Sequence, residues 1–237
     1  MIRIWNQLKT YFNWSTGKDS ALALYYLLQD KNYDVGQLVT TINRQHNRVT
    51  MHGLRQELLE RQMAALGIPY RTIVLPENPD METYNAMIAD TTRSLMTDGF
   101  GYAAFGDIFL EDLRTYREKQ HEVFNVKTVF PLWQRDTKDL LLEFIALGFK
   151  AIAVCVDGSK MDSSFAGRII NEEFLKDLPA DVDPCGENGE YHTFCYDGPI
   201  FKHAISFEVA EQVYVEYPAP SGMGAEDKMG FWYCDLR

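Results

Sequence analysis

The residue types best suited to chemistry gather near the start of the chain, around Gly17. The aromatic segment from Tyr11 to Trp14 predicts a short buried strand before this glycine, and the apolar segment from Ala21 to Leu28 predicts a buried helix after it. A strand, a tight turn and a helix aim backbone N–H groups and the positive end of the helix at an anion. Because the turn also offers hydroxyls, an ammonium and a carboxylate, it predicts a phosphate-binding loop made of Ser15, Thr16, Gly17, Lys18, Asp19 and Ser20.

This loop is not a Walker A P-loop, which needs the pattern Gly-x4-Gly-Lys-Ser/Thr. Phe12 stands five residues before Gly17, and Asp19 follows Lys18. The pattern Ser-x-Gly-Lys-Asp-Ser instead resembles the pyrophosphate loop of the N-type ATP pyrophosphatases, with Thr16 at a position that is usually glycine. The resemblance implies cleavage of ATP between the α and β phosphates, which yields AMP and pyrophosphate.

A second polar, glycine-rich segment lies much later in the chain, from Cys185 to Phe194. With the turn around Gly17 and three shorter runs, it resembles one branch of the pyrophosphatases, the diphthine–ammonia ligase family and its bacterial relatives. The resemblance extends from about Lys9 to Phe201. The three shorter runs are Gly106-Asp107-Ile108, Pro131-Leu132-Trp133 and Asp197-Gly198-Pro199-Ile200-Phe201.

The resemblance implies an ATP-dependent amidation. In the ligases, the carboxylate of diphthine on translation elongation factor 2 attacks the α phosphorus of ATP, pyrophosphate leaves, and an acyl-adenylate forms. Ammonia then attacks the acyl carbon and releases AMP. We therefore expect this chain to use ATP, Mg²⁺, ammonia and a carboxylate acceptor.

Pyrophosphate is a highly charged leaving group, so preorganised donors and a metal ion must meet the charge that develops on it. We expect Asp19 and Asp107 as Mg²⁺ ligands, because Mg²⁺ usually binds one or two carboxylates together with phosphates and water. The expected nucleotide-binding residues are Ser15, Thr16, Gly17, Lys18, Asp19, Ser20, Asn43 and Gly106.

The later glycine-rich segment is the expected acceptor site. Diphthine carries a trimethylammonium group, which suits the carboxylates of Glu187 and Glu190 and an aromatic face from Tyr191 or Trp133. His192 is expected to take a proton from the attacking ammonium. The acceptor residues are then Gly186, Glu187, Asn188, Gly189, Glu190 and Tyr191, and the catalytic set is Lys18, Asp19, Asp107, Glu187, Glu190 and His192.

Some of these residues also have simpler explanations. Asp107 would serve equally as a helix N-cap, because the acids Glu111 and Asp112 follow it. His192 would be a satisfied structural group, and Trp133 would be part of the core. A solvated helix face is expected for four charged residues, Glu111, Arg114, Arg117 and Glu118.

Strands and helices alternate along most of the chain. Apolar runs predict strands over 11–14, 36–42, 70–75, 102–105, 128–130 and 151–156, and apolar stripes predict helices over 54–66, 81–97, 111–124 and 137–147. This alternation predicts a doubly wound parallel sheet covered on both faces, and the resemblance implies five strands of the adenine nucleotide alpha hydrolase-like type. Ligands bind beyond the carboxyl ends of such strands, where Asn43 and Gly106 are expected.

The pattern changes after Asp157. Apolar and polar residues alternate with period two over 205–209 and 213–217, which predicts antiparallel strands, and the run 231–234 predicts a last strand. We therefore expect two parts, an ATP-binding domain over 1–157 and a smaller C-terminal α+β substrate-binding subdomain over 158–237.

Composition narrows the class of protein. The 237 residues include 23 Lys and Arg against 34 Asp and Glu, a formal net charge of −11 without a basic tract, so direct nucleic-acid binding is not expected. No apolar segment is long enough to predict a signal peptide or a membrane span. The four cysteines form no Cys-x-x-Cys pair, which predicts a cytoplasmic protein with reduced thiols and no structural zinc.

Two other functions agree with the same motifs. One is an amide ligase that acts on the carboxylate of a small metabolite, for example in cofactor salvage. The other is a sensor that binds ATP without turning it over. Lys18, Asp19 and the two glutamates Glu187 and Glu190 favour turnover. Pairing with a second copy of the chain is expected from the resemblance alone.

Overall fold

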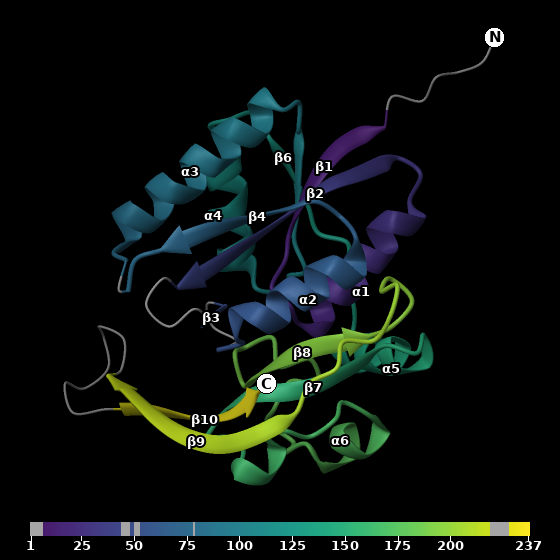
Figure 1. Ribbon diagram of the computed structural model, residues 1–237, viewed down its shortest axis with the longest axis vertical. Coiled ribbons are helices and arrows are strands. Elements are labelled where there is room, and N and C mark those ends of the chain that lie inside the picture. Colours follow the sequence, from purple (N-terminus) through teal and green to yellow (C-terminus); the bar gives the residue numbers. More distant parts are fainter. Residues whose placement is uncertain (1–6, 44–47, 50–52, 78, 219–227) are drawn as a thin grey trace.

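The computed structural model describes residues 7–43, 48–49, 53–77, 79–218 and 228–237 (Figure 1). Five strands run parallel in the order β4-β2-β1-β5-β6. The five-stranded parallel sheet is therefore confirmed, and the short β3 (Arg48–Val49) adds an antiparallel pairing at the end of β2. The parallel strands are β1 (Leu8–Asn13), β2 (Tyr33–Asn43), β4 (Tyr70–Leu75), β5 (Tyr102–Ala104) and β6 (Lys127–Val129).

The strand order reverses beside β1. The chain builds outward from β1 to β2 and β4, and then returns to place β5 and β6 on the other side of β1. The turn around Gly17 follows β1, and Gly106 follows β5. Both segments therefore lie at the switch point, where open α/β sheets bind ligands.

Helices cover both faces of this sheet, α1 (Lys18–Gln29) and α2 (Gln56–Leu66) on one face and α3 (Met81–Thr97) and α4 (Glu111–Glu122) on the other (Figure 1). Successive side chains of a strand point to opposite faces. Accordingly, Phe12 packs in the apolar cluster that contains α1 and α2, whereas Tyr11 packs in the cluster that contains Leu95 of α3. Burial on both faces explains the unbroken aromatic run of β1.

A second, antiparallel sheet has the order β8-β7-β10-β9. The predicted period-two strand over 213–217 is confirmed as part of β9, but residues 205–208 are not a strand. The elements of the chain from α5 onward are α5 (Thr137–Ala146), β7 (Lys150–Asp157), a 3₁₀ turn (Ser163–Phe165), α6 (Glu172–Asp177), β8 (Tyr191–Asp197), β9 (Val209–Pro218) and β10 (Lys228–Leu236).

The strand predicted over 151–156 is β7, and it pairs antiparallel with β8 and β10 instead of extending the parallel sheet. Residues 151–156 are all buried, so their sequence has the continuous apolar run that a parallel strand also shows, and periodicity does not separate the two cases. Since β7 shares a sheet with residues beyond 158, we propose a boundary between β6 and α5 instead of after residue 157.

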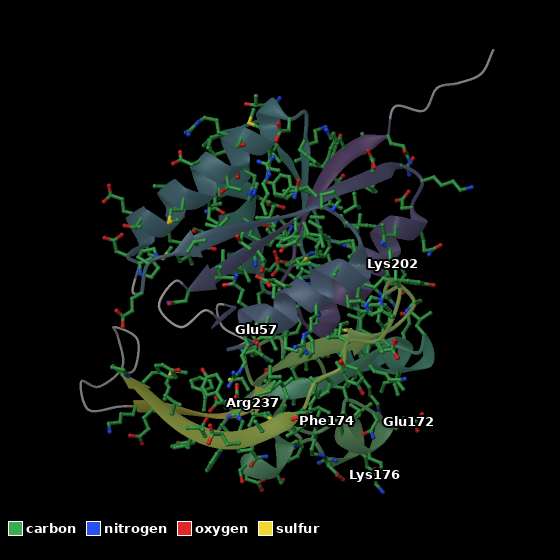
Figure 2. All side chains as sticks on the ribbon, viewed as in Figure 1. Glu57, Glu172, Phe174, Lys176, Lys202 and Arg237 are labelled. Carbon is green, nitrogen blue, oxygen red and sulfur yellow. The ribbon has the colours of Figure 1, made fainter. Side chains whose placement is uncertain are left out.

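The second sheet packs beneath α1 and α2, so these helices lie between the two sheets (Figure 1). Figure 2 shows Glu57 at the start of α2 and Lys202 beside its end, charges that complement the helix dipole. The Lys202 N–H also donates to the Ala65 carbonyl at 2.9 Å. The segment after β8 is thereby attached to the end of α2.

Gly106 provides a test of the contact between the two loops at the switch point. A Cβ at this position would lie 3.0 Å from Ser20 N, so Gly106→Ala must push the loop after β5 away from the first turn of α1. We expect it to lower the free energy of unfolding by about 1–3 kcal/mol in urea denaturation. Gly101→Ala is the matched control, because nothing lies within 4 Å of its Cβ. Equal effects of the two substitutions would contradict this packing.

Candidate functional site

The turn between β1 and α1 has the predicted strand–loop–helix form. Gly17 is the extended residue before α1, and Thr16 adopts φ of 78°, a left-handed conformation that is rare for a β-branched residue. Inside the turn, Ser15 Oγ and Ser20 Oγ are hydrogen-bonded at 2.7 Å, and Ser15 N donates to Ser20 Oγ at 3.2 Å. The two serines thus close the loop on itself.

Lys18 is buried, with 2% of its surface exposed. Its Nζ donates to Asp19 Oδ2 at 2.8 Å and to the Cys185 carbonyl, and lies 4.9 Å from the centre of the Tyr191 ring. Burial alone would lower the pKa of Lys18, but the Asp19 carboxylate together with Tyr191 and Cys185 raises it overall, so Lys18 stays charged. The cation of the predicted phosphate loop is thus held jointly by its neighbour and by the later glycine-rich segment.

One of the predicted phosphate donors is already occupied. The Lys18 backbone N–H donates to Thr193 Oγ1 of β8 at 3.0 Å, so a distant threonine caps the first turn of α1. The Gly17 N–H makes a long contact of 3.4 Å with Ser15 Oγ.

The loop after β5 brings Asp107 close to the first turn of α1 through the contact of Gly106 with Ser20. Asp107 does not cap α4, because the N-cap is Leu110, and that alternative was wrong. Its Oδ2 forms an ion pair with Arg117 Nε at 2.6 Å, not aligned as a hydrogen bond, and Arg117 Nη2 donates to Oδ1 at 3.1 Å.

The sequence predicts that Arg117 lies on a solvated helix face, and for this residue the prediction is wrong. Its guanidinium lies 4.4 Å from the Phe105 ring centre, and the Asp107 side chain that it pairs with is only 11% exposed. Arg114, from the same set of four charged residues, pairs with Glu118 at 2.7 Å, and its guanidinium lies 4.6 Å from the Trp133 ring centre. Trp133 is half-buried and not part of the core.

Glu187 joins the later segment to the loop after β5. Its Oε1 accepts hydrogen bonds from Ile108 N at 2.7 Å and from Phe109 N at 3.4 Å. Burial raises the pKa of Glu187 to about 7, with the negative charges of Asp19 and Asp107 acting in the same direction. The structure thus places a carboxyl that titrates near neutral pH next to the predicted nucleotide loop.

Glu190, in contrast, is directed into its own segment. Its Oε1 accepts from Asp183 N and from Asn188 Nδ2, and its Oε2 accepts from Asn188 N, all at 3.0 Å. Gly186, at φ of 68°, would carry a Cβ 2.7 Å from the Tyr191 ring. These contacts shape the segment, so we propose that Glu190 and Gly186 support Glu187 instead of binding the acceptor. Gly189 also has a positive φ, of 91°, and Asn188 is exposed.

Two further predicted residues have constrained surroundings. Tyr191 is buried, donates to the Pro184 carbonyl at 2.5 Å, and packs against Phe174, so its ring already contacts Lys18 on the inside of the protein. Burial, with the charge of Lys18, lowers the pKa of His192 to about 4, so its imidazole is neutral at physiological pH.

Asn43 lies further along the sheet edge. Val39 pairs with Asn13, the last residue of β1. Asn43 is four residues further along β2, so it lies roughly 13 Å beyond the end of β1. Its Nδ2 donates to the Glu77 carbonyl at 3.0 Å. The assignment of Asn43 to the nucleotide stays a prediction.

Sequence reasoning missed Gln62, Thr193 and Arg117. Gln62 is a fully buried polar residue of α2 that contacts both Trp14 and Thr16, and it follows Leu58 by one helical turn, inside the predicted apolar stripe. A polar residue at such a position was the one available signal. Thr193 is 175 residues from its partner Lys18, and Arg117 is 10 residues from its partner Asp107. Neither residue carries a comparable signal in the sequence.

The two carboxylates predicted to bind Mg²⁺, Asp19 and Asp107, differ in how accessible they are to a metal ion. Among residues 7–43, 48–49, 53–77, 79–218 and 228–237, no group of three or more His, Cys, Asp or Glu is arranged to hold a metal ion. Asp19 is 29% exposed, so it can reach a ligand, whereas both oxygens of Asp107 face Arg117. The four cysteines are free and buried. Within the described part of the chain, no helix has the length and apolar character to cross a membrane.

Comparison with known proteins places these features in a family. Residues 8–128 match the diphthamide synthase N-terminal domain and residues 136–219 match the diphthamide synthase C-terminal domain. Similar curated proteins are named diphthine–ammonia ligase. The Rattus norvegicus protein is 33% identical over 137 residues, which cover 52% of this chain and 51% of that protein. The Homo sapiens protein is 35% identical over 94 residues, which cover 38% and 35%.

The chain therefore spans about half or less of the length of these relatives. Among solved structures, it is similar to the U34-tRNA thiolase NcsA from Methanococcus maripaludis, with a TM-score of 0.36, 19% identity, and coverage of 60% of this chain and 59% of that one. That likeness is too weak to bear on the site. The two domain matches, in contrast, contain both loops of the site, and the N-terminal match alone covers more than half of the sequence. The chain belongs to the diphthamide synthase family.

Proposed function

We propose that this protein is an ATP-dependent amide ligase, which adenylates a carboxylate with release of pyrophosphate and then transfers ammonia to the acyl group. The observation that carries the proposal is the convergence of Lys18, Asp19 and Glu187 at the switch point of the parallel sheet. A cation and backbone amides suit the phosphates, while a carboxyl that titrates near neutral pH suits proton transfer.

The triphosphate binds at the turn between β1 and α1 in this proposal. Lys18 supplies the positive charge, and the amides of Gly17 and Asp19 and the hydroxyls of Ser15 and Ser20 supply the donors. Mg²⁺, which the family's use of ATP implies, neutralises charge on the phosphates when bound. Asp19 is the side chain that we assign to it, because it is the more exposed of the two predicted carboxylates. Asp107, paired with Arg117, holds the loop after β5 in place.

The proton released when ammonia attacks goes to Glu187 in this mechanism, not to His192. An effective general base has a pKa near the working pH. The pKa of Glu187 is raised to about 7, whereas that of His192 is lowered to about 4 by burial. His192 is therefore a weak base at neutral pH, and we propose a structural role for it within β8.

The names of the relatives support diphthine as the acceptor. Of the two aromatic rings predicted to face its cation, Tyr191 is buried against Lys18, so Trp133 is the ring that we retain, although Arg114 lies over it. A small-metabolite carboxylate is the alternative acceptor. The proximity of Asp19 and Glu187 to Lys18 favours a catalyst over a non-catalytic ATP sensor.

Product analysis tests the reaction class. With ATP labelled at the α phosphorus, ammonia and a diphthine-bearing elongation factor, we expect labelled AMP and one pyrophosphate for each amide formed. Chromatography of the label and mass spectrometry of the acceptor would show this. Labelled ADP would contradict α–β cleavage. ATP binding without any product on protein or small carboxylates would favour the sensor.

Lys18→Met tests the phosphate loop. Charge-assisted hydrogen bonds contribute about 1.5–3 kcal/mol, so removing the ammonium is expected to weaken ATP binding by about 10- to 100-fold. Isothermal titration calorimetry measures the change. Lys160→Met is the control, because Lys160 pairs with the exposed Asp181 through a similar contact of 2.7 Å away from the loop. An affinity for ATP that Lys18→Met leaves intact would remove the loop assignment.

Glu187→Gln tests the shifted carboxyl through stability. Folded Glu187 keeps its proton up to about pH 7, whereas in the unfolded chain the ordinary pKa of this carboxyl is 4.5, so the group's contribution to folding is lost as pH rises between these values. From pH 5 to pH 8, wild type should lose about 1–3 kcal/mol relative to Glu187→Gln in urea titrations. The opposite slope from His192 is common to both proteins and cancels. A pH-independent difference would refute the raised pKa.

A further inference from the structure

Gln62 is a fully buried amide that contacts three separate parts of the chain. Its Oε1 accepts from Trp14 Nε1 at 2.7 Å, and its Nε2 donates to the Thr16 carbonyl at 3.0 Å and to the Cys195 carbonyl at 2.6 Å. A donor on one side and two acceptors on the other determine which end of the amide is oxygen. The side chain therefore has one orientation, set by the end of β1, the phosphate loop and β8.

Thr16 is the strained residue of the loop. Its φ of 78° brings a branched side chain into the left-handed region, which costs free energy unless the surroundings hold the residue there. The surroundings do so through its carbonyl oxygen, which accepts from Gln62 Nε2 at 3.0 Å and from Cys195 N at 2.9 Å. These two bonds hold the conformation that a glycine would adopt without strain.

Holding this carbonyl also sets the direction of the next amide. A trans peptide is planar, and its C=O and N–H point in opposite directions. Because the Thr16 C=O points at Gln62 and β8, the Gly17 N–H must point away from them, toward the side where Ser15 Oγ lies at 3.4 Å. Gly17 is one of the donors that the proposed function assigns to phosphate.

We infer that Gln62 is a positioning residue for the phosphate-binding loop, which holds the Thr16–Gly17 peptide so that the Gly17 amide faces the triphosphate. This inference rests on the proposed binding of ATP by that loop. Gln62 itself does not contact the nucleotide, because its amide is consumed by Trp14, Thr16 and Cys195.

Gln62→Met tests the inference, since methionine has a similar length and no hydrogen-bonding amide. We expect the folded variant to bind a non-cleavable ATP analogue, with a methylene group between the α and β phosphorus atoms, about tenfold more weakly than wild type in calorimetry. Gln37→Met is the matched control. Gln37 is also buried, at 8% exposure, but its Nε2 makes only a 3.5 Å contact with the adjacent Leu38 carbonyl, so this variant should keep wild-type affinity.

A second substitution separates positioning from stability. Thr16→Gly removes the strain, so the double variant Thr16→Gly with Gln62→Met should recover affinity to within about threefold of wild type. Its thermal stability should stay low, because Trp14 Nε1 and the Cys195 carbonyl still lack their partner. This rescue of binding without rescue of stability is the result that a merely structural Gln62 would not produce.

The outcomes are distinct. Unchanged analogue affinity in folded Gln62→Met, or weakened affinity that Thr16→Gly does not restore, overturns the positioning role while leaving the proposed function intact. Failure of both the single and the double variant to fold also overturns it, because Gln62 would then serve folding alone. If wild type itself does not bind the analogue, the proposed function fails as well.

Discussion

The buried ammonium of Lys18 is the constraint on which the rest of the site depends. A charge removed from water is costly unless it is paired and hydrogen-bonded. Lys18 meets that condition with the Asp19 carboxylate, the Cys185 carbonyl and the face of the Tyr191 ring. Only Asp19 is a neighbour in sequence. The other two partners come from the segment before β8 and from the first residue of β8, so the turn around Gly17 can keep its buried cation only where the second sheet is packed against α1.

This requirement makes the two sheets share one site. Thr193 of β8 caps the first turn of α1, and Cys195 of the same strand holds the strained Thr16. Glu187 reaches across to the backbone of Ile108, in the loop that follows β5. Three loops that are far apart in the chain are therefore joined by direct hydrogen bonds, and a movement of the second sheet would alter both the turn around Gly17 and the surroundings of the Glu187 carboxyl.

The charges of the site are arranged in unequal environments. Asp19, Asp107 and Glu187 lie close enough to influence one another, yet only two of them have a cationic partner, Lys18 for Asp19 and Arg117 for Asp107. Glu187 has backbone donors instead, which offset burial only in part. The result is one carboxyl that titrates near neutral pH beside two that are paired, a division of roles that suits phosphate binding and proton transfer in one place.

Local pattern in the sequence determined the strand–turn–helix around Gly17, the positions of β1, β2, β4, β5 and β6, and the position of Gly106, because periodicity and turn chemistry act over a few residues. Only the tertiary structure decided that Glu187 faces Ile108 while Glu190 faces its own segment, that Arg117 pairs with Asp107, and that β7 joins the second sheet. The physical reason is that these partners are chosen by packing and by the direction of each hydrogen bond. Neither leaves a fixed spacing along the chain, so two glutamates three residues apart take opposite roles.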